Sequence, residues 1–153
     1  YVQHVMENGP SALMPITIGR TFYMGVDPVM EQNNAIYREQ SILVQELAEK
    51  SDCVIVRRSA DYILRDKNPL RLFIYADMES RMERCRKRAP EQEHFTDKEL
   101  RRHIQDVDKR RSKYYQFFTG QTWGDRLNYD LCINTSNYDI KELVHAIAHL
   151  VEA

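Results

Sequence analysis

Three short runs of consecutive apolar residues occur along the chain, at residues 53–56, 72–76 and 131–133. The first two are rich in β-branched and aromatic side chains, which is typical of strands covered on both faces. Segments with helical apolar spacing separate the runs. Strands that alternate with helices predict an α/β fold with a parallel sheet flanked by helices.

Capping residues mark the starts of the predicted helices. The first helix begins after Asp27 and Pro28 and runs to about Lys50, because aspartate caps a helix and proline suits its first turn. The second is capped by Asp77. Its predicted apolar stripe consists of Met78, Met82, Cys85 and Ala89, and another face carries Arg81, Arg84 and Arg88.

Two further helices are predicted to begin near residues 96 and 139. Thr96 and Glu99 form a capping box, and the helix that it opens is expected to reach Phe118. Asp139 with Glu142 opens the last helix. This helix is expected to pack through Ile140, Leu143, Val144, Ile147 and Val151.

An arginine interrupts the apolar stripe of the third helix. The stripe comprises Leu100, Ile104, Val107, position 111, Tyr114 and Phe118, and position 111 is arginine. A guanidinium drawn toward low dielectric needs an anion, and its planar fork suits a carboxylate or a phosphate. Asp108 is a candidate for a structural partner, whereas Arg111 and Arg110 together are candidates for holding a bound phosphate. Both interpretations stay open.

Polar side chains also fall on the buried side of the first helix. Gln40 and Ser41 lie within its two apolar stripes, and Arg38 lies beside them. Buried amide and hydroxyl groups bond either to the protein itself or to a polar ligand. The pattern leaves both alternatives open.

Charged residues follow the first predicted strand. Arg57 and Arg58 come directly after Val56, and Asp61 comes three residues later. Ligands of open parallel sheets bind beyond the carboxyl ends of the strands. Arg58 and Asp61 are therefore candidate ligand-binding residues, with a purely structural role at the strand end as the alternative.

Composition and charge describe a single globular domain. The 153 residues are 42% apolar and 29% charged with a net charge of −1, which excludes a disordered or strongly basic chain. Residues 81–126 hold 13 of the 22 Lys and Arg but 8 of the 23 Asp and Glu. We expect a basic, lid-like region on an acidic body.

Cysteine usage and hydropathy favour a cytoplasmic location. Cys53, Cys85 and Cys132 have no Cys-x-x-Cys spacing and are expected to be reduced, buried thiols. No apolar stretch of 18 residues is present, so no membrane partner is expected. Self-association into a homo-oligomer stays open.

Other candidate chemistry is weaker. His145 and His149 have a zinc-compatible spacing but no third ligand accompanies them, so no metal site is predicted. Residues 109–115 interleave cations with aromatics as RNA-binding segments do. Because Tyr114 belongs to the apolar stripe, nucleic acid is not a favoured partner. No nucleophile and base stand at a spacing typical of hydrolases.

Several segments, taken in order, resemble the bacterial cytidylate kinase-like family. They are residues 53–64, 72–81 and 108–115, followed by Thr119-Gly120 and residues 123–125. The resemblance runs from about Gln40 to the C-terminus. It implies a P-loop nucleoside monophosphate kinase fold, in which the γ-phosphoryl group of ATP passes to CMP, dCMP or a related monophosphate with Mg²⁺. The acceptor phosphate is then the nucleophile, so the protein contributes positioning and positive charge.

The resemblance also implies roles for individual residues. By position, Arg58 and Asp61 would contact the acceptor nucleotide, and Arg38 would contact its phosphate. Asp108 and Arg111 would lie near the transferring phosphoryl group, with Arg110 on the basic lid. Gln40 and Ser41 join the predicted substrate-binding residues.

Two features depart from the family pattern. Arg57 stands where the family has glycine. The chain also contains no G-x-x-x-x-G-K-[ST] sequence, which would cradle the phosphates of ATP. In the family this loop belongs to a first strand and helix, which we expect to precede Tyr1, and residues 1–26 are given no predicted structure. The alternative function is a nucleotide-binding or protein-interaction module that has lost the loop and does not catalyse transfer.

Overall fold

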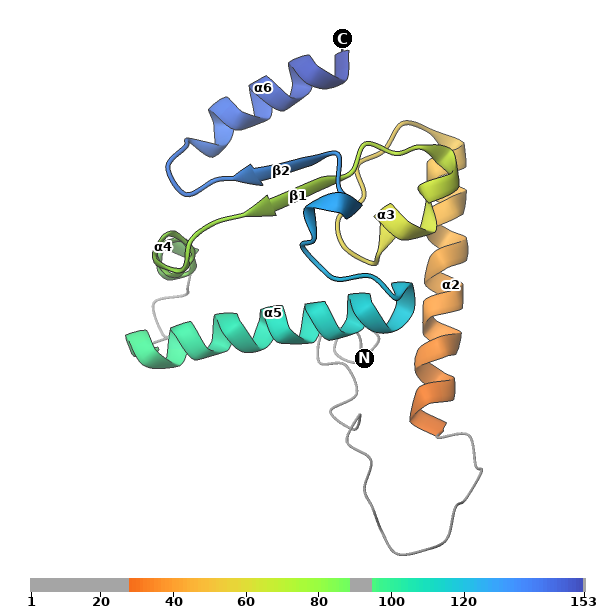
Figure 1. Cartoon of the computed structure of the whole chain (residues 1–153), viewed down its shortest axis with the longest axis horizontal. Helices are drawn as coiled ribbons and strands as arrows, with labels where there is room; N and C mark the ends of the chain where they lie inside the picture. The colour runs from red at the N-terminus through yellow and green to blue at the C-terminus, as the bar shows by residue number, and fades with distance from the viewer. Residues whose placement is uncertain (1–27, 89–94, 153) are drawn as a thin grey trace, which may run out of the picture. The chain divides into compact units, whose positions relative to one another are not determined.

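The computed structural model describes residues 28–88 and 95–152, in which helices precede, separate and follow two strands (Figure 1). The α/β fold class predicted from the sequence is confirmed. In chain order the elements are α2 (Pro28–Lys50), α3 (Ala60–Ile63), the 3-10 turn η1 (Arg65–Lys67), β1 (Leu72–Tyr75), α4 (Met78–Arg88), α5 (Asp97–Thr119), the 3-10 turn η2 (Arg126–Asn128), β2 (Leu131–Asn134) and α6 (Ile140–Glu152).

The described residues form a sheet of two parallel strands, β1 and β2, whose arrows point the same way in Figure 1. Leu72 pairs with Leu131 at one end, and Tyr75 pairs with Asn134 at the other. At the start of the strands, the guanidinium of Arg71 donates to both carboxylate oxygens of Asp130, at 2.8 and 3.1 Å. The second and third predicted strands are therefore confirmed as parallel neighbours.

The first predicted strand is not formed in the part of the chain that the structure describes. Residues 52–56 belong to no helix or strand. Val54 is 93% exposed and Val56 is 74% exposed, while Ile55 packs against a small apolar cluster. An apolar run becomes a strand only where a neighbouring strand satisfies its backbone groups and covers its faces. No described segment pairs with this run.

The predicted helices are confirmed, and local caps begin three of them. The Asp77 carboxylate accepts from the Ser80 backbone N–H at 2.7 Å. The Thr96 N–H donates to Glu99 Oε2 at 2.9 Å, as a capping box requires. The Asp139 carboxylate accepts from the backbone of Lys141 at 2.7 Å. The predicted Asp27 cap of α2 lies outside the described residues.

The chain divides into two compact units, which are described separately. The described part of the first unit comprises residues 28–69 and Arg110–Gln121. The second comprises residues 70–88, 95–109 and 122–152. Helix α5 contributes to both units. The prediction that residues 1–153 form one domain stays a prediction.

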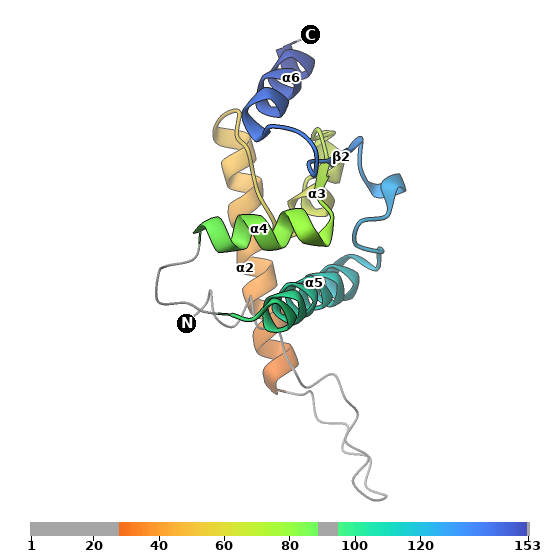
Figure 2. The same cartoon turned by 90° about the vertical axis from the view of Figure 1, so that its left-hand side faces the viewer.

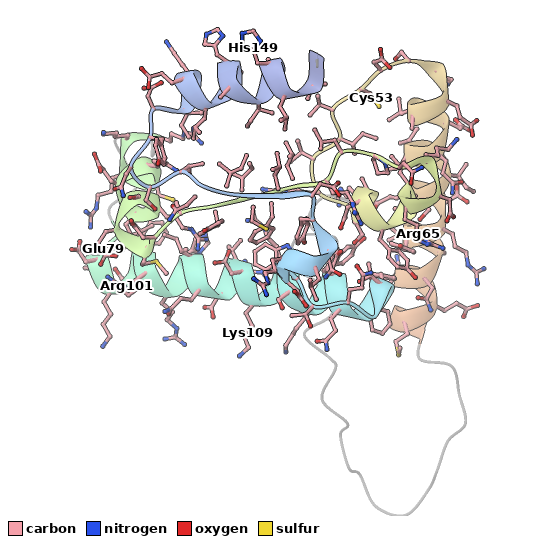
Figure 3. The ribbon with its side chains drawn as sticks, turned by 45° about the horizontal axis from the view of Figure 1, so that its top comes forward. Cys53, Arg65, Glu79, Arg101, Lys109 and His149 are labelled. Carbon is pink, nitrogen blue, oxygen red and sulfur yellow. The ribbon has the colours of Figure 1, made fainter. Side chains whose placement is uncertain are left out.

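Each unit has its own apolar cluster. In the first, α3 lies beside α2 (Figure 1), and the buried members are Val44, Ala60, Ile63 and Leu64. In the second, α4 packs against the N-terminal half of α5 (Figure 2), and the buried members are Met82, Leu100 and Ile104. Figure 3 shows Glu79 of α4 next to Arg101 of α5, where the two side chains form an ion pair at 2.5 Å.

Three predictions about buried surface are wrong. Cys53, Cys85 and Cys132 are all exposed free thiols. Cys85 lies beyond the α4 stripe that α5 covers, which consists of Met78 and Met82. The apolar face of α6 is also largely uncovered, since Val144 is 58% exposed and Val151 is 64% exposed. Apolar spacing predicts which face a helix offers, but burial also needs a neighbouring element against that face.

Among residues 28–88 and 95–152, no helix combines the length and the apolar character that a membrane span requires.

Candidate functional site

A left-handed turn leads into α3 in the first unit. Arg57, Arg58 and Ser59 have φ angles of 73°, 64° and 52°. Residues other than glycine seldom adopt this conformation, because the β-carbon approaches the backbone, and the strain costs about 1–2 kcal/mol per residue. The Ser59 carbonyl accepts from the N–H groups of Tyr62 and Ile63, at 3.0 and 2.9 Å. These bonds anchor the strained turn to the helix that follows it.

The turn bears on position 57, where the resemblance described above implies a glycine. The backbone there lies in the region that glycine occupies at no steric cost. Arg57 keeps that conformation despite its β-carbon. Its neighbour Arg58 is half-buried, whereas Arg57 itself is exposed.

Asp61, on the first turn of α3, is held by a buried tyrosine of α5. The Tyr115 hydroxyl donates to Asp61 Oδ2 at 2.6 Å, and Gln121 Oε1 lies 2.9 Å from the same hydroxyl. Tyr115 is 5% exposed. This contact fixes the direction of the Asp61 carboxylate. Tyr115 lies one position away from the predicted apolar stripe, so helical spacing did not mark it as a site residue.

The hydroxyl of the adjacent residue, Tyr114, has a different environment. Its hydroxyl is buried and has no hydrogen-bond partner among the described residues. Its ring contacts Phe118, with 4.7 Å between the ring centroids, and Phe118 stacks on Tyr37 at 4.2 Å. Burial raises the pKa of Tyr114 to about 12, an effect to which Tyr37 adds and which the Arg58 guanidinium opposes. The hydroxyl therefore keeps its proton at neutral pH.

Helix α2 supplies the predicted substrate-binding residues with mixed results. The Ser41 hydroxyl donates to the Tyr37 carbonyl at 2.8 Å, so its proton is used within the helix. Gln40 Oε1 is buried and has no partner in the described part of the chain. Arg38 is exposed. Of these three, Gln40 has the clearest unmet bonding capacity.

The Ser59 hydroxyl is a third buried polar group that no described residue satisfies. A buried polar group without a partner costs about 1–3 kcal/mol. The three orphaned atoms, on Gln40, Ser59 and Tyr114, all belong to the first unit. Such groups in a native structure call for an explanation, which can be an ordered water, an ion or a bound ligand.

The predicted catalytic residues all lie on α5. Arg110 and Arg111 are half-buried and belong to the first unit. Asp108 belongs to the second unit, where Arg81 of α4 donates to both of its carboxylate oxygens, at 2.6 and 2.8 Å. Arg81 was predicted only as part of a polar helix face, because 27 residues separate it from Asp108 in the chain.

The first unit thus contains most of the predicted site residues, and the second unit contains Asp108. Those in the first unit are Arg38, Gln40, Ser41, Arg58, Asp61, Arg110 and Arg111. Their side chains offer guanidinium groups for a phosphate and amide or carboxylate oxygens for neutral parts of a ligand. No group of three or more His, Cys, Asp or Glu among the described residues could hold a metal ion.

Comparisons with known proteins agree with the resemblance. A solved structure of an uncharacterized protein from Eubacterium ventriosum ATCC 27560 is 29% identical, with a TM-score of 0.69, and the match covers 82% of this chain and 68% of that one. No curated protein matches the chain. The sequence profile of the cytidylate kinase-like family matches residues 2–137. The chain therefore belongs to the cytidylate kinase-like family.

Proposed function

We propose that this protein transfers the γ-phosphoryl group of ATP to a nucleoside monophosphate, with CMP and dCMP as the preferred acceptors. Family membership supports a kinase-like enzyme. The observation that carries the proposal is the left-handed turn of residues 57–59, which holds Arg58 near Tyr114 while Tyr115 fixes Asp61. The strained turn thus carries a cation, Arg58, and leads to an oriented carboxylate, Asp61. Such a pair suits a ligand that has both an anionic group and a hydroxyl group.

Each residue of the first unit has a proposed role toward the acceptor. Arg58 and Arg38 bind its phosphate, because guanidinium forks match phosphate oxygens. Asp61 accepts a hydrogen bond from the nucleoside, with its other oxygen already held by Tyr115. Gln40 Oε1, a buried acceptor, suits an amino group such as the one that cytosine has and uracil lacks. This last contact favours CMP over UMP.

The chemistry needs no protein nucleophile. An acceptor phosphate oxygen forms a bond to the γ-phosphorus, the bond from that phosphorus to the β,γ-bridging oxygen breaks, and ADP leaves with the electron pair. Arg110 and Arg111 stabilise the charge on the transferring group.

The described residues show no dedicated site for two groups that the reaction implies. The sequence has no G-x-x-x-x-G-K-[ST] loop for the phosphates of ATP, and the described residues offer no cluster for Mg²⁺. Mg²⁺ usually enters such sites bound to phosphate oxygens and water, and it neutralises their charge. No step is therefore assigned to a protein-bound metal.

A coupled assay of ADP release by the intact protein tests the proposal, with MgATP and each of CMP, dCMP, UMP and AMP. We expect turnover with CMP and dCMP, and slower turnover with UMP. No ADP release with any of the four would overturn the transferase. Tight binding of CMP without ADP release would instead favour a nucleotide-binding module.

A further inference from the structure

Two buried hydroxyls near Arg58 have no hydrogen-bond partner among the described residues. Ser59 follows Arg58 in the chain and is 5% exposed, and its Oγ has no hydrogen-bond partner among the described residues. The Tyr114 hydroxyl is buried in the same unpaired state, within the electrostatic reach of Arg58. Neither residue was singled out for ligand binding by its sequence pattern.

The surrounding structure restrains the ring of Tyr114 and the backbone of Ser59. The Tyr114 ring packs against Phe118, and its hydroxyl is buried. The Ser59 backbone is held by the two hydrogen bonds that its carbonyl accepts from α3. Buried donors on restrained elements beside a cation are partly preorganised for an anion.

We propose that Ser59 and Tyr114 are phosphate-binding residues, whose hydroxyls donate hydrogen bonds to the phosphomonoester group that Arg58 attracts. This inference rests on the proposed function, since the phosphomonoester is that of the acceptor nucleotide. Inorganic phosphate has the same oxygen chemistry and serves as the minimal probe.

The donor set favours a phosphate over other parts of a nucleotide. A phosphomonoester carries three terminal acceptor oxygens, and the site offers three donor side chains, Arg58, Ser59 and Tyr114. At neutral pH the Tyr114 hydroxyl is protonated and donates. Gln40 presents an acceptor oxygen instead, so it faces a different part of the ligand.

Calorimetric binding to the full chain tests this assignment with Tyr114→Phe and Ser59→Ala. The probes are CMP, cytidine and inorganic phosphate. Hydrogen bonds to charged groups are strong, so each variant should raise the Kd of CMP and of phosphate by about tenfold or more. The Kd of cytidine should stay unchanged, because cytidine has no phosphate.

A stability measurement separates ligand binding from a structural role. Removing an unsatisfied buried hydroxyl does not weaken the free protein, so the Tm of Tyr114→Phe should equal or exceed that of the wild type. Tyr115→Phe should lower the Tm, because it breaks the contact to Asp61. Tyr138→Phe, which removes a hydroxyl from a side chain in the second unit that is 63% exposed, is the control and should change neither reading.

Several results would overturn the assignment. They are an unchanged Kd of CMP in Tyr114→Phe and Ser59→Ala, an equal loss of cytidine binding, or a fall in Tm for Tyr114→Phe as large as that of Tyr115→Phe. Failure of the wild type to bind either CMP or phosphate would overturn both this inference and the proposed function. The expected binding pattern without ADP release would overturn the transferase alone.

Discussion

Adjacent tyrosines on α5 show how much one hydroxyl depends on its surroundings. Tyr115 donates to Asp61, whereas the buried Tyr114 hydroxyl has no partner among the described residues. Helical spacing assigned Tyr114 to the apolar core and gave Tyr115 no role. The spacing could not reveal either outcome, because Asp61 lies 54 residues away in the chain. The amino-acid type of a single residue therefore does not determine the role of its side chain.

Arg111 is the residue whose substitution best tests catalysis. If its guanidinium stabilises the transferring phosphoryl group, Arg111→Ala should lower kcat by about two to three orders of magnitude, as loss of a transition-state donor does elsewhere. Steady-state ADP release measures the effect. Lys113→Ala, which removes an exposed cation two residues along α5, is the control and should leave kcat unchanged. An unchanged kcat in Arg111→Ala would indicate that this arginine has a structural role.

Local elements were the part of the fold that the sequence predicted best. The capping box of Thr96 and Glu99 and the Asp139 cap involve residues at most three apart, so their pattern is visible in a short stretch of chain. The run at residues 53–56 has strand composition but no described partner. Strand formation depends on distant segments, and composition carries no record of them. For the same reason the partnership of Arg81 with Asp108 was missed.

The strained turn before α3 gives a stability prediction. Arg57→Gly removes the β-carbon clash at a φ of 73°, so we expect the free energy of unfolding to rise by about 0.5–1 kcal/mol after the greater chain entropy of glycine is counted. Urea denaturation measures the change. Arg57→Ala is the matched control, since it removes the same side chain but keeps the β-carbon. Equal stability of the two variants would show that the turn is not strained at this position.

The ion pair of Arg71 and Asp130, at the start of β1 and β2, gives a prediction about how stability depends on pH. Hydrogen bonds from the Arg71 side chain and backbone lower the pKa of Asp130 below its usual value of about 3.9. The pair therefore contributes stability above the unfolded-state pKa, and this contribution is lost as the pH falls through the lower folded-state pKa.

Thermal unfolding of wild type and Asp130→Asn between pH 7 and pH 2 checks this. The Tm difference between them should be largest at neutral pH and should shrink below about pH 4. Since both side chains are more than one-third exposed, by 34% and 38%, the effect should be modest and should weaken in high salt. A constant difference across the range would contradict the linkage.

On the scale of the whole molecule, α5 is the element common to both compact units. Unfolding either unit would remove the packing along part of one continuous helix, so we expect the chain to unfold in one cooperative transition. The fluorescence of Trp123, the only tryptophan, reports on the second unit, where its ring packs edge-on to Phe73 with centroids 5.4 Å apart.

Hydrogen exchange of the amides of α2 reports on the first unit in the same urea series. Coincident midpoints for the two probes would support the prediction of a single domain. Separate midpoints would mean that the two units are independently stable, despite the shared helix. The same two probes can be used on the variant proteins, because none of the proposed substitutions replaces Trp123 or a residue of α2.

The three surface thiols have a practical consequence for every solution experiment. Exposed cysteines oxidise in air and can join separate chains through sulfur. A dimer seen without reductant would therefore say nothing about a noncovalent oligomer. Sedimentation in the presence of a thiol reductant, repeated with Cys53, Cys85 and Cys132 changed to serine, would distinguish true assembly from cross-linking.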